Sequence, residues 1–220
     1  MSRDSESRCL PLMEFPELAD APIRAAFSLR LPGLPVSTDK QIVMAALAPW
    51  LDGTAAVVAP GRGLITAEQT HGKDVAVVTA QEGSVPMVDG LLTARRDRVL
   101  AIAVADCCPV WLWAPDGSAI AVVHAGRMGT EAGIAVAAAD LLARQSGHPV
   151  ASLGAFLGPC IRPPHYEVDI PALLHAQLAA SGVCDIRDCG LDTALDLGRF
   201  YSYRTEKGHT GRMIAFGWLP

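Results

Sequence analysis

The stretch "RVLAIAVADCCPVWLWAPDGSAIAVVHAG" at residues 98–126 carries most of the information about the fold. Its apolar runs at 98–106, 109–113 and 118–124 are short, bounded by turn residues and apolar on both faces, which is typical of strands in a sheet covered on each side. The Asp-Gly dipeptide between the last two runs favours a tight turn. We therefore expect these two runs to pair as a hairpin, with His124 at its outgoing end.

The rest of the chain adds further strands and separate helices. Helices are expected where a capping residue precedes a run of helix formers and a glycine ends it, as with Thr130 and Gly147 or Asp169 and Gly182. The expected strands are 55–59, 63–69 and 74–80, and the expected helices are 37–50, 130–147 and 169–182. Hairpins mixed with separate helices indicate the α+β class, with mixed sheets sandwiched by helices.

Composition limits the classes of function. Half of the 220 side chains are apolar and the net charge is −5, which favours one compact domain and argues against a nucleic-acid binder. Residues 1–24 are polar and acidic where a secretory signal would be basic and then apolar, so we expect a flexible leader followed by one domain over 25–220. No membrane partner, a cytoplasmic location and a monomer are expected.

The six cysteines are expected to be reduced thiols, because a chain of this size without a secretory signal does not match a small disulfide-stapled domain. Two of them, Cys107 and Cys108, are adjacent. Since successive side chains of a strand point to opposite faces, we expect Cys107 to face a site and Cys108 to face the core.

Three residues have the chemistry of a metal site. His71 lies in the turn "QTHGKD", and Cys107 and His124 lie at strand ends. Two imidazoles and a thiolate suit zinc and leave one tetrahedral position open, as catalytic zinc requires. The alternative is a buried cysteine acting as a small hydrophobe beside two turn histidines. Asp106 weighs against that alternative, because a carboxylate ending an apolar strand needs polar partners.

The segment "HAGRMGT" at 124–130 is a glycine-rich turn that leads into an expected helix, an arrangement that favours an anion. Arg127 strengthens this interpretation, although an ordinary strand-to-helix loop would have the same composition. Arg30 and Arg204 are further candidate anion contacts, or else solvated surface residues.

These stretches resemble the bacterial laccase-domain family, also known as the YfiH-like or peptidoglycan editing factor family. The resemblance rests on "FSLR" at 27–30, "EQTHGKDVAVV" at 68–78, "DGLLT" at 89–93, "ADCCPVWLW" at 105–113, "AVVHAG" at 121–126, "GPCIRPPHYEVD" at 158–169 and "YSYRTEKGHTGRM" at 201–213. It implies a four-layer α/β/β/α sandwich. It also implies phosphorolysis of adenosine, inosine and guanosine, with methylthioadenosine cleavage and adenosine deamination as companion activities.

The resemblance also implies roles for individual residues. The metal ligands and catalytic centre fall on His71, Cys107 and His124, with zinc as the metal and copper as the second choice. The expected substrate and phosphate contacts are Arg30, Asp89, Arg127 and Arg204, of which Arg127 lies outside the matched stretches.

Two departures from the family pattern bear on the substrate. The family reads His-Ala-Gly-Trp-Arg-Gly where this chain has "HAGRMG" at 124–129, so the arginine is displaced by one residue and the expected contact with the anion is weakened. The segment "LPGLPVSTDKQ" at 31–41 is also shorter than its family counterpart, which helps to enclose the ligand.

Three other functions compete with nucleoside phosphorolysis. A metal-free hydrolase would use Cys107 as nucleophile and His124 as base, and it could act on misassembled peptidoglycan precursors. A metal-binding protein with little catalysis would account for the altered "HAGRMG". A polyphenol oxidase would need several histidine clusters, whereas the sequence offers a single three-ligand group.

Overall fold

The computed structural model describes residues 8–220, which form two six-stranded sheets and the helices that cover them. In spatial order the first sheet contains β1 (Leu12–Met13), β2 (Arg24–Ser28), β12 (Met213–Trp218), β7 (Arg98–Val104), β3 (Gly63–Ala67) and β5 (Gly83–Val85). The second contains β11 (Asp185–Asp188), β10 (Gly154–Leu157), β8 (Cys108–Trp113), β9 (Ile120–Ala125), β6 (Gly90–Thr93) and β4 (Val75–Val77). Each sheet combines parallel and antiparallel pairs, which confirms the expected mixed sheets.

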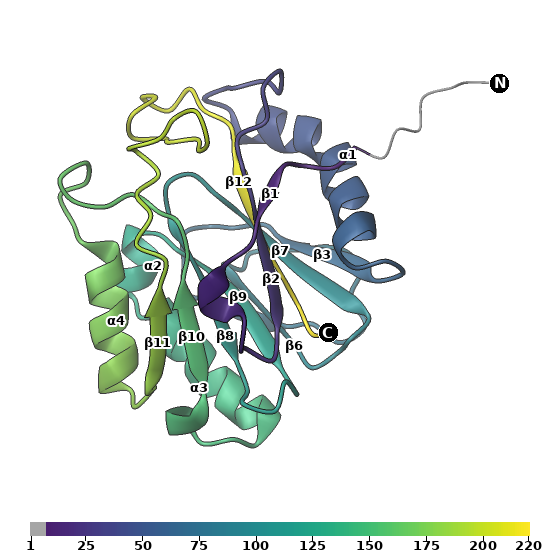
Figure 1. The fold of residues 1–220 in the computed structure, drawn as a ribbon, viewed down its shortest axis with the longest axis vertical. Helices are drawn as coiled ribbons and strands as arrows, with labels where there is room; N and C mark the ends of the chain where they lie inside the picture. Colours follow the sequence, from purple (N-terminus) through teal and green to yellow (C-terminus); the bar gives the residue numbers. More distant parts are fainter. Residues whose placement is uncertain (1–7) are drawn as a thin grey trace.

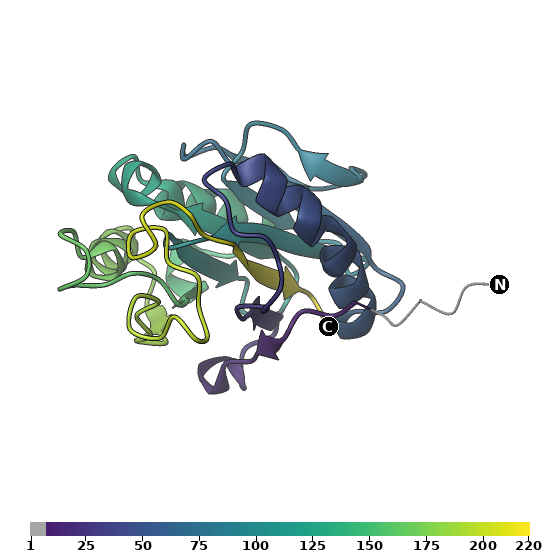
Figure 2. The ribbon, with the colours of Figure 1, turned by 90° about the horizontal axis from the view of Figure 1, so that it is seen from above.

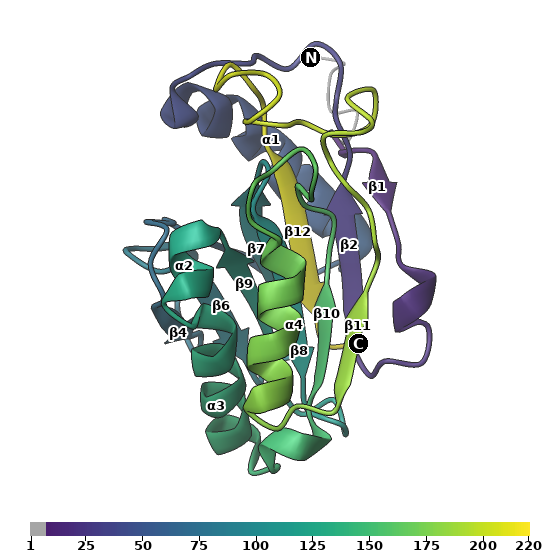
Figure 3. The same ribbon diagram turned by 90° about the vertical axis from the view of Figure 1, so that its left-hand side faces the viewer.

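The helices are arranged on the outer faces of the two sheets. They are α1 (Lys40–Val58), α2 (Arg127–Glu131), α3 (Ile134–Ser146) and α4 (Ile170–Ala180), with short 3-10 turns η1 (Pro16–Leu18) and η2 (Val150–Ser152). In Figure 1, α1 lies on one side of the strands and α4 on the other. Figure 3 shows α3 and α4 in front of β8, β9 and β10.

Three apolar layers hold this arrangement together. One lies between the two sheets, one between the second sheet and helices α3 and α4, and one between the first sheet and α1. Three apolar layers separate four layers of secondary structure, so the α/β/β/α sandwich of the α+β class is confirmed.

The hairpin predicted from the opening stretch is confirmed. Strands β8 and β9 pair antiparallel from Cys108↔Ala125 to Trp113↔Ile120. Along β9, Ile120 and Val122 point into the layer between the sheets, and Val123 points toward the helices. His124 is two residues after Val122, so its side chain points to the same face of the strand. It therefore lies at the end of the inter-sheet layer, opposite Pro109.

Two predicted elements differ from the structure. Residues 55–59, expected as a strand, form the end of α1, which continues beyond residue 50 and through Pro49. The expected helix from Thr130 is two helices, because Gly133 adopts a left-handed φ of 82° between α2 and α3. Gly147, with φ 75°, ends α3 as predicted.

The N-terminal segment also differs from the expected leader. Residues 1–7 lie outside the described part of the chain. From Leu10 onward the segment is packed: Leu12–Met13 pairs with β2, and Leu10, Phe15 and Ile23 are buried. Phe15 and Ile23 pack in the layer between the two sheets, and Leu10 packs in the layer against α1. These tertiary contacts are not visible as a periodic pattern in the sequence.

Among residues 8–220, α1 is the one helix long and apolar enough to cross a membrane by length and composition. In this fold, however, Val43, Leu47 and Leu51 of α1 pack in the apolar layer on the first sheet. These three apolar residues of the helix therefore belong to the core.

We expect Asp169→Ala to lower the free energy of unfolding by about 1 kcal/mol. Asp169 caps α4, its side chain accepting a hydrogen bond from the Ala172 N–H at 3.0 Å. Urea unfolding of the two proteins measures the change. Equal unfolding free energies would contradict a contribution from this cap.

One end of the sandwich carries two long loops. The segment 30–39 before α1 and the segment 199–212 before β12 lie side by side there, joined by a bridge between Ser37 and Thr210. Figure 2 shows the C-terminal loop, in yellow, crossing this end between α1 and the helices of the second sheet.

Candidate metal centre

His71, Cys107 and His124 come together at the end where these loops lie. His71 is on the loop after β3, Cys107 directly precedes β8, and His124 is near the end of β9. Their potential ligand atoms all lie within 4.8 Å of one another. They are the one such group of three or more His, Cys, Asp or Glu residues among residues 8–220.

Two hydrogen bonds between Gln69 and Ala103 attach the loop that carries His71 to the first sheet. The Gln69 amide pairs with the backbone of Ala103 in β7, donating to its carbonyl at 2.7 Å and accepting from its N–H at 3.0 Å. His71 itself has a left-handed φ of 63°, a conformation that costs energy for a non-glycine residue. The tertiary contacts of this loop therefore impose the direction of the His71 side chain.

Asp89, directly before β6, contacts two of the three candidate ligands, His71 and His124. It is fully buried, and its carboxylate accepts hydrogen bonds from the backbone N–H groups of residues 70–72, the Thr70 hydroxyl and Nδ1 of His124. The bond to His124 is 2.8 Å long and leaves Nε2 of that ring free for a metal. Asp89, expected to contact substrate, does not line the pocket and instead holds two of the candidate ligands, the backbone of His71 and the ring of His124.

The neighbouring charges shift the pKa values of Cys107 and His124 toward their charged forms. Burial alone would raise the pKa of the Cys107 thiol, but the neighbouring His124 and His71 lower it to about 6. Burial alone would lower the pKa of His124, but Cys107 and Asp89 raise it. Both shifts favour the Cys107 thiolate beside a protonated His124 when no metal is bound, and deprotonated sulfur is the form that binds metals.

The space between the ligands fits a metal ion. Gly126 lies beside them, and a Cβ there would lie 2.9 Å from Sγ of Cys107 and 3.5 Å from Cδ2 of His71. Two imidazoles and a thiolate are a ligand set that zinc and copper both accept. Cys108, by contrast, is buried among the residues that pack on α3 and α4.

We expect Gly126→Ala to weaken metal binding at least about 10-fold, since displacing even an outer partner of a metal site costs about 10- to 100-fold. The backbone of Gly126 (φ −79°, ψ 178°) tolerates alanine, so the effect comes from the clash with Cys107. Competition with a chromophoric chelator measures affinity, and thermal unfolding of the metal-free variant shows whether the fold is intact. Unchanged affinity would mean that the ligands do not need this space.

A pocket of about 680 Å³ opens from the three ligands. Its wall includes Arg127 and Arg204, both expected there, and three residues that sequence analysis did not single out, Lys40, Tyr166 and Arg212. Arg212 lies within the matched stretch 201–213, whereas Lys40 lies in the shortened segment. Neither has a local pattern that separates it from a surface cation.

The two expected arginines of this wall have acidic partners. Arg127 pairs with Glu131 at 2.9 Å and with Glu167 at 3.5 Å. Arg204 pairs with Glu167 at 3.3 Å, and its guanidinium lies over the ring of Tyr166. Met128, at the family's arginine position, is exposed and does not line the pocket.

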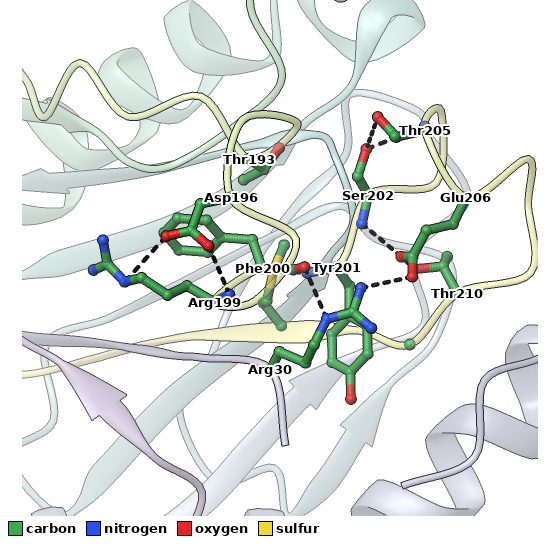
Figure 4. Close-up of polar contacts among 12 residues, drawn as sticks. Arg30, Thr193, Asp196, Arg199, Phe200, Tyr201, Ser202, Thr205, Glu206 and Thr210 are labelled. Atoms are coloured by element: carbon green, nitrogen blue, oxygen red, sulfur yellow. Dashed lines mark hydrogen bonds and ion pairs between the residues drawn. The ribbon is translucent and has the colours of Figure 1, made fainter. Parts of the chain in front are cut away.

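Arg30 lies outside the pocket, in a network that Figure 4 shows. It donates to the Phe200 carbonyl at 3.0 Å and to Glu206 at 2.6 Å, and it lies over the ring of Tyr201. Glu206 in turn accepts from the Thr210 hydroxyl and the Ser202 N–H. Arg30 thus fastens the loop 199–212 rather than contacting the pocket.

Asp106, expected to have polar partners, has them. It is buried and accepts hydrogen bonds from the Thr193 hydroxyl at 3.2 Å and the Arg204 N–H at 2.8 Å. The contact with Arg204 holds the loop 199–212 near the end of β7.

The chain also resembles known proteins. The family model described as multi-copper polyphenol oxidoreductase laccase matches residues 36–171 and 165–220. Purine nucleoside phosphorylase ORF3 of Streptomyces griseus is 35% identical over 180 residues, which cover 69% of this chain and 72% of that protein. Purine nucleoside phosphorylase YlmD of Geobacillus stearothermophilus is 28% identical over 236 residues, covering 84% and 81% of the two chains.

Solved structures share the fold. The crystal structure of YlmD from Geobacillus stearothermophilus superposes with a TM-score of 0.79 and 23% identity, covering 99% of this chain and 98% of that one. Bacillus licheniformis hypothetical protein YfiH gives a TM-score of 0.79 over 95% and 96% of the two chains. Since the family model covers most of the sequence and a relative at 35% identity covers more than two thirds of it, this chain belongs to the laccase-domain, or YfiH-like, family.

Proposed function

We propose that this protein is a zinc-dependent purine nucleoside phosphorylase that accepts adenosine, inosine and guanosine. The observation that carries the proposal is the opening of the His71, Cys107 and His124 group into a pocket rich in lysine and arginine. The purine nucleoside phosphorylase names of the relatives support the same reaction. The pocket volume, about 680 Å³, is within the usual range for small-molecule sites.

In phosphorolysis, a phosphate oxygen forms a bond to C1′ of the ribose while the bond from C1′ to the purine nitrogen breaks. The electron pair of that bond leaves with the base, which takes up a proton, and the products are a free purine and ribose 1-phosphate. The pocket must therefore hold an anion against a neutral nucleoside. The cationic side chains of the wall supply that attraction, in a setting partly withdrawn from water.

A zinc ion bound at this centre would supply a Lewis acid and a means of activating water. The chain's own residues hold the ligand geometry: Asp89 keeps His124 in the tautomer with Nε2 free, and Gln69 fixes the loop of His71. Water activation is also the chemistry of zinc deaminases, and it supports adenosine deamination as a companion activity. Cleavage of methylthioadenosine is the other companion activity that we propose.

The test is metal analysis coupled to a nucleoside screen. We expect about one zinc per chain, release of purine and ribose 1-phosphate from inosine and adenosine in phosphate buffer, and no purine release without phosphate. Hypoxanthine release that is independent of phosphate would contradict phosphorolysis. A metal-loaded protein that cleaves no nucleoside would favour a metal-binding protein with little catalysis.

A hydrolase that uses Cys107 and His124 is the second candidate, and the lowered pKa of the Cys107 thiol favours it. Editing of peptidoglycan precursors would be one use of such chemistry. Iodoacetamide distinguishes the two, because a metal bound through Cys107 blocks alkylation. A protein that keeps its metal while Cys107 is alkylated would favour the hydrolase.

Multi-copper oxidation, named in the family description, is not proposed, because the described residues contain a single three-ligand group. We propose a cytoplasmic location, since all six cysteines are free thiols and free thiols are typical of reducing compartments. The expected monomer stays a prediction.

A further inference from the structure

Among residues 8–220, five lysines and arginines line the pocket beside the candidate metal ligands, but a single carboxylate does, Asp106. That carboxylate is buried and accepts hydrogen bonds from protein donors. The chain as a whole has a net charge of −5. A cationic pocket in an acidic protein indicates an anionic ligand, because clefts lined by one sign of charge concentrate the opposite sign.

The five cations are not equivalent. Arg127 and Arg204 are already neutralised by Glu131 and Glu167, and Lys207 is exposed. Lys40 and Arg212 are partly buried, and neither has a carboxylate within 4.0 Å in the described part of the chain. Their recorded hydrogen bonds go to carbonyl oxygens, of Gln69 for Lys40 and of Gly211 for Arg212.

Lys40 also occupies an unfavourable position in its helix. It is the first residue of α1, where the positive end of the helix dipole disfavours a cation. Burial lowers its pKa, and the nearby charge of Arg212 lowers it further. Asp89 and Cys107 attract Lys40 from farther away, and Cys107 and Asp106 attract Arg212. No carboxylate lies within 4.0 Å of either cation among residues 8–220, so an anion bound between the two like charges would stabilise both.

We propose that Lys40 and Arg212 bind the phosphate cosubstrate, as a tetrahedral oxyanion, at the side of the pocket next to Gln69 and Cys107. This proposal rests on the proposed function only in identifying the anion as inorganic phosphate. The start of α1 supplies Lys40, and the loop before β12 supplies Arg212. The Ser37–Thr210 bridge and the Arg30–Glu206 ion pair hold these loops together. The displaced arginine of "HAGRMG" is therefore not the principal phosphate contact.

The experiment is calorimetric titration of the metal-loaded protein with inorganic phosphate at constant ionic strength. Lys40→Met and Arg212→Gln should each weaken phosphate binding about 10-fold or more, the effect of losing one charge-assisted hydrogen bond. Arg212→Lys should retain more affinity than Arg212→Gln. Metal content is measured for every variant, so that loss of the metal is not mistaken for loss of a contact with phosphate.

Two further variants calibrate the effect. Arg144→Gln removes a positive charge from the last turn of α3, away from the pocket lining, and should leave phosphate affinity unchanged. Arg127→Gln removes a cation that lines the pocket but is paired, and should change affinity less than Lys40→Met. An effect of Arg127→Gln as large as that of Lys40→Met would overturn the assignment.

The outcomes separate this proposal from the proposed function. Phosphate bound through Lys40 and Arg212 by a protein that cleaves no nucleoside would leave the anion site standing and contradict the phosphorylase. Phosphate-dependent nucleoside cleavage, with phosphate affinity unchanged in both variants, would overturn the anion site and leave the phosphorylase standing. No phosphate binding by the unaltered protein would also overturn it.

Discussion

Cys107→Ser is expected to weaken metal binding by at least about 100-fold and to abolish phosphate-dependent nucleoside cleavage, since even outer partners of a metal site are worth about 10- to 100-fold. The residue supplies the one thiolate of the group, and its hydroxyl replacement stays protonated at neutral pH. The fold should be retained, because Cys107 lies at the pocket wall and not within the apolar layers. Metal analysis, cleavage rates and thermal unfolding of the variant measure the three properties.

The matched control is the adjacent cysteine. Cys108 is fully buried among residues that pack on α3 and α4, so Cys108→Ala should keep its metal while losing some stability to the small cavity. Loss of metal in Cys108→Ala and retention in Cys107→Ser would reverse the assignment. A Cys107→Ser protein that keeps its metal but loses activity would point to a cysteine nucleophile.

Asp89→Ala is expected to lower the free energy of unfolding by about 3–5 kcal/mol, the usual cost of removing one partner of a buried charged pair. The change leaves five donors without their acceptor: three consecutive backbone N–H groups, a hydroxyl and an imidazole. Metal affinity should also fall by about 10- to 100-fold, because His124 and the loop of His71 lose their orientation. Urea unfolding of the metal-free proteins isolates the stability effect from the loss of metal.

Asp89 also predicts a pH dependence. Burial alone would raise the pKa of its carboxyl, but the bonds from His124 and the backbone hold that pKa below its ordinary value. The stability that it contributes is therefore present above pH about 4, the ordinary value for aspartate, and is lost as the pH falls toward the lower folded-state pKa. Asp89→Ala should lose less stability than the unaltered protein between neutral and acidic pH. Parallel acid unfolding curves would contradict this contribution.

The strands and caps that the sequence predicts correctly depend on interactions between near neighbours. An Asp-Gly turn between two apolar runs determines the β8–β9 hairpin, and Asp169 caps the helix that begins directly after it. Residues 55–59 show the limit of such patterns. A short apolar run rich in alanine and valine suits a strand or the end of a helix, and its packing in α1 against the first sheet favours the helix.

The candidate metal ligands could be proposed from residue type and from the family resemblance, because two imidazoles and a thiolate are a ligand set that suits zinc. The surrounding residues could not be assigned in this way. Arg30 pairs with Glu206 across 176 positions of sequence, although it lies in the matched motif "FSLR", whereas Lys40, which lines the pocket, lies in the shortened segment 31–41.

Whether an arginine or lysine is neutralised, exposed or left facing a pocket depends on which carboxylates the tertiary structure brings within about 4 Å of it. For Arg127 these are Glu131 and Glu167, and for Lys40 and Arg212 there are none among residues 8–220. Residue type alone thus determined which groups can bind a metal, whereas the distances between distant segments decided which charges remain available to a ligand.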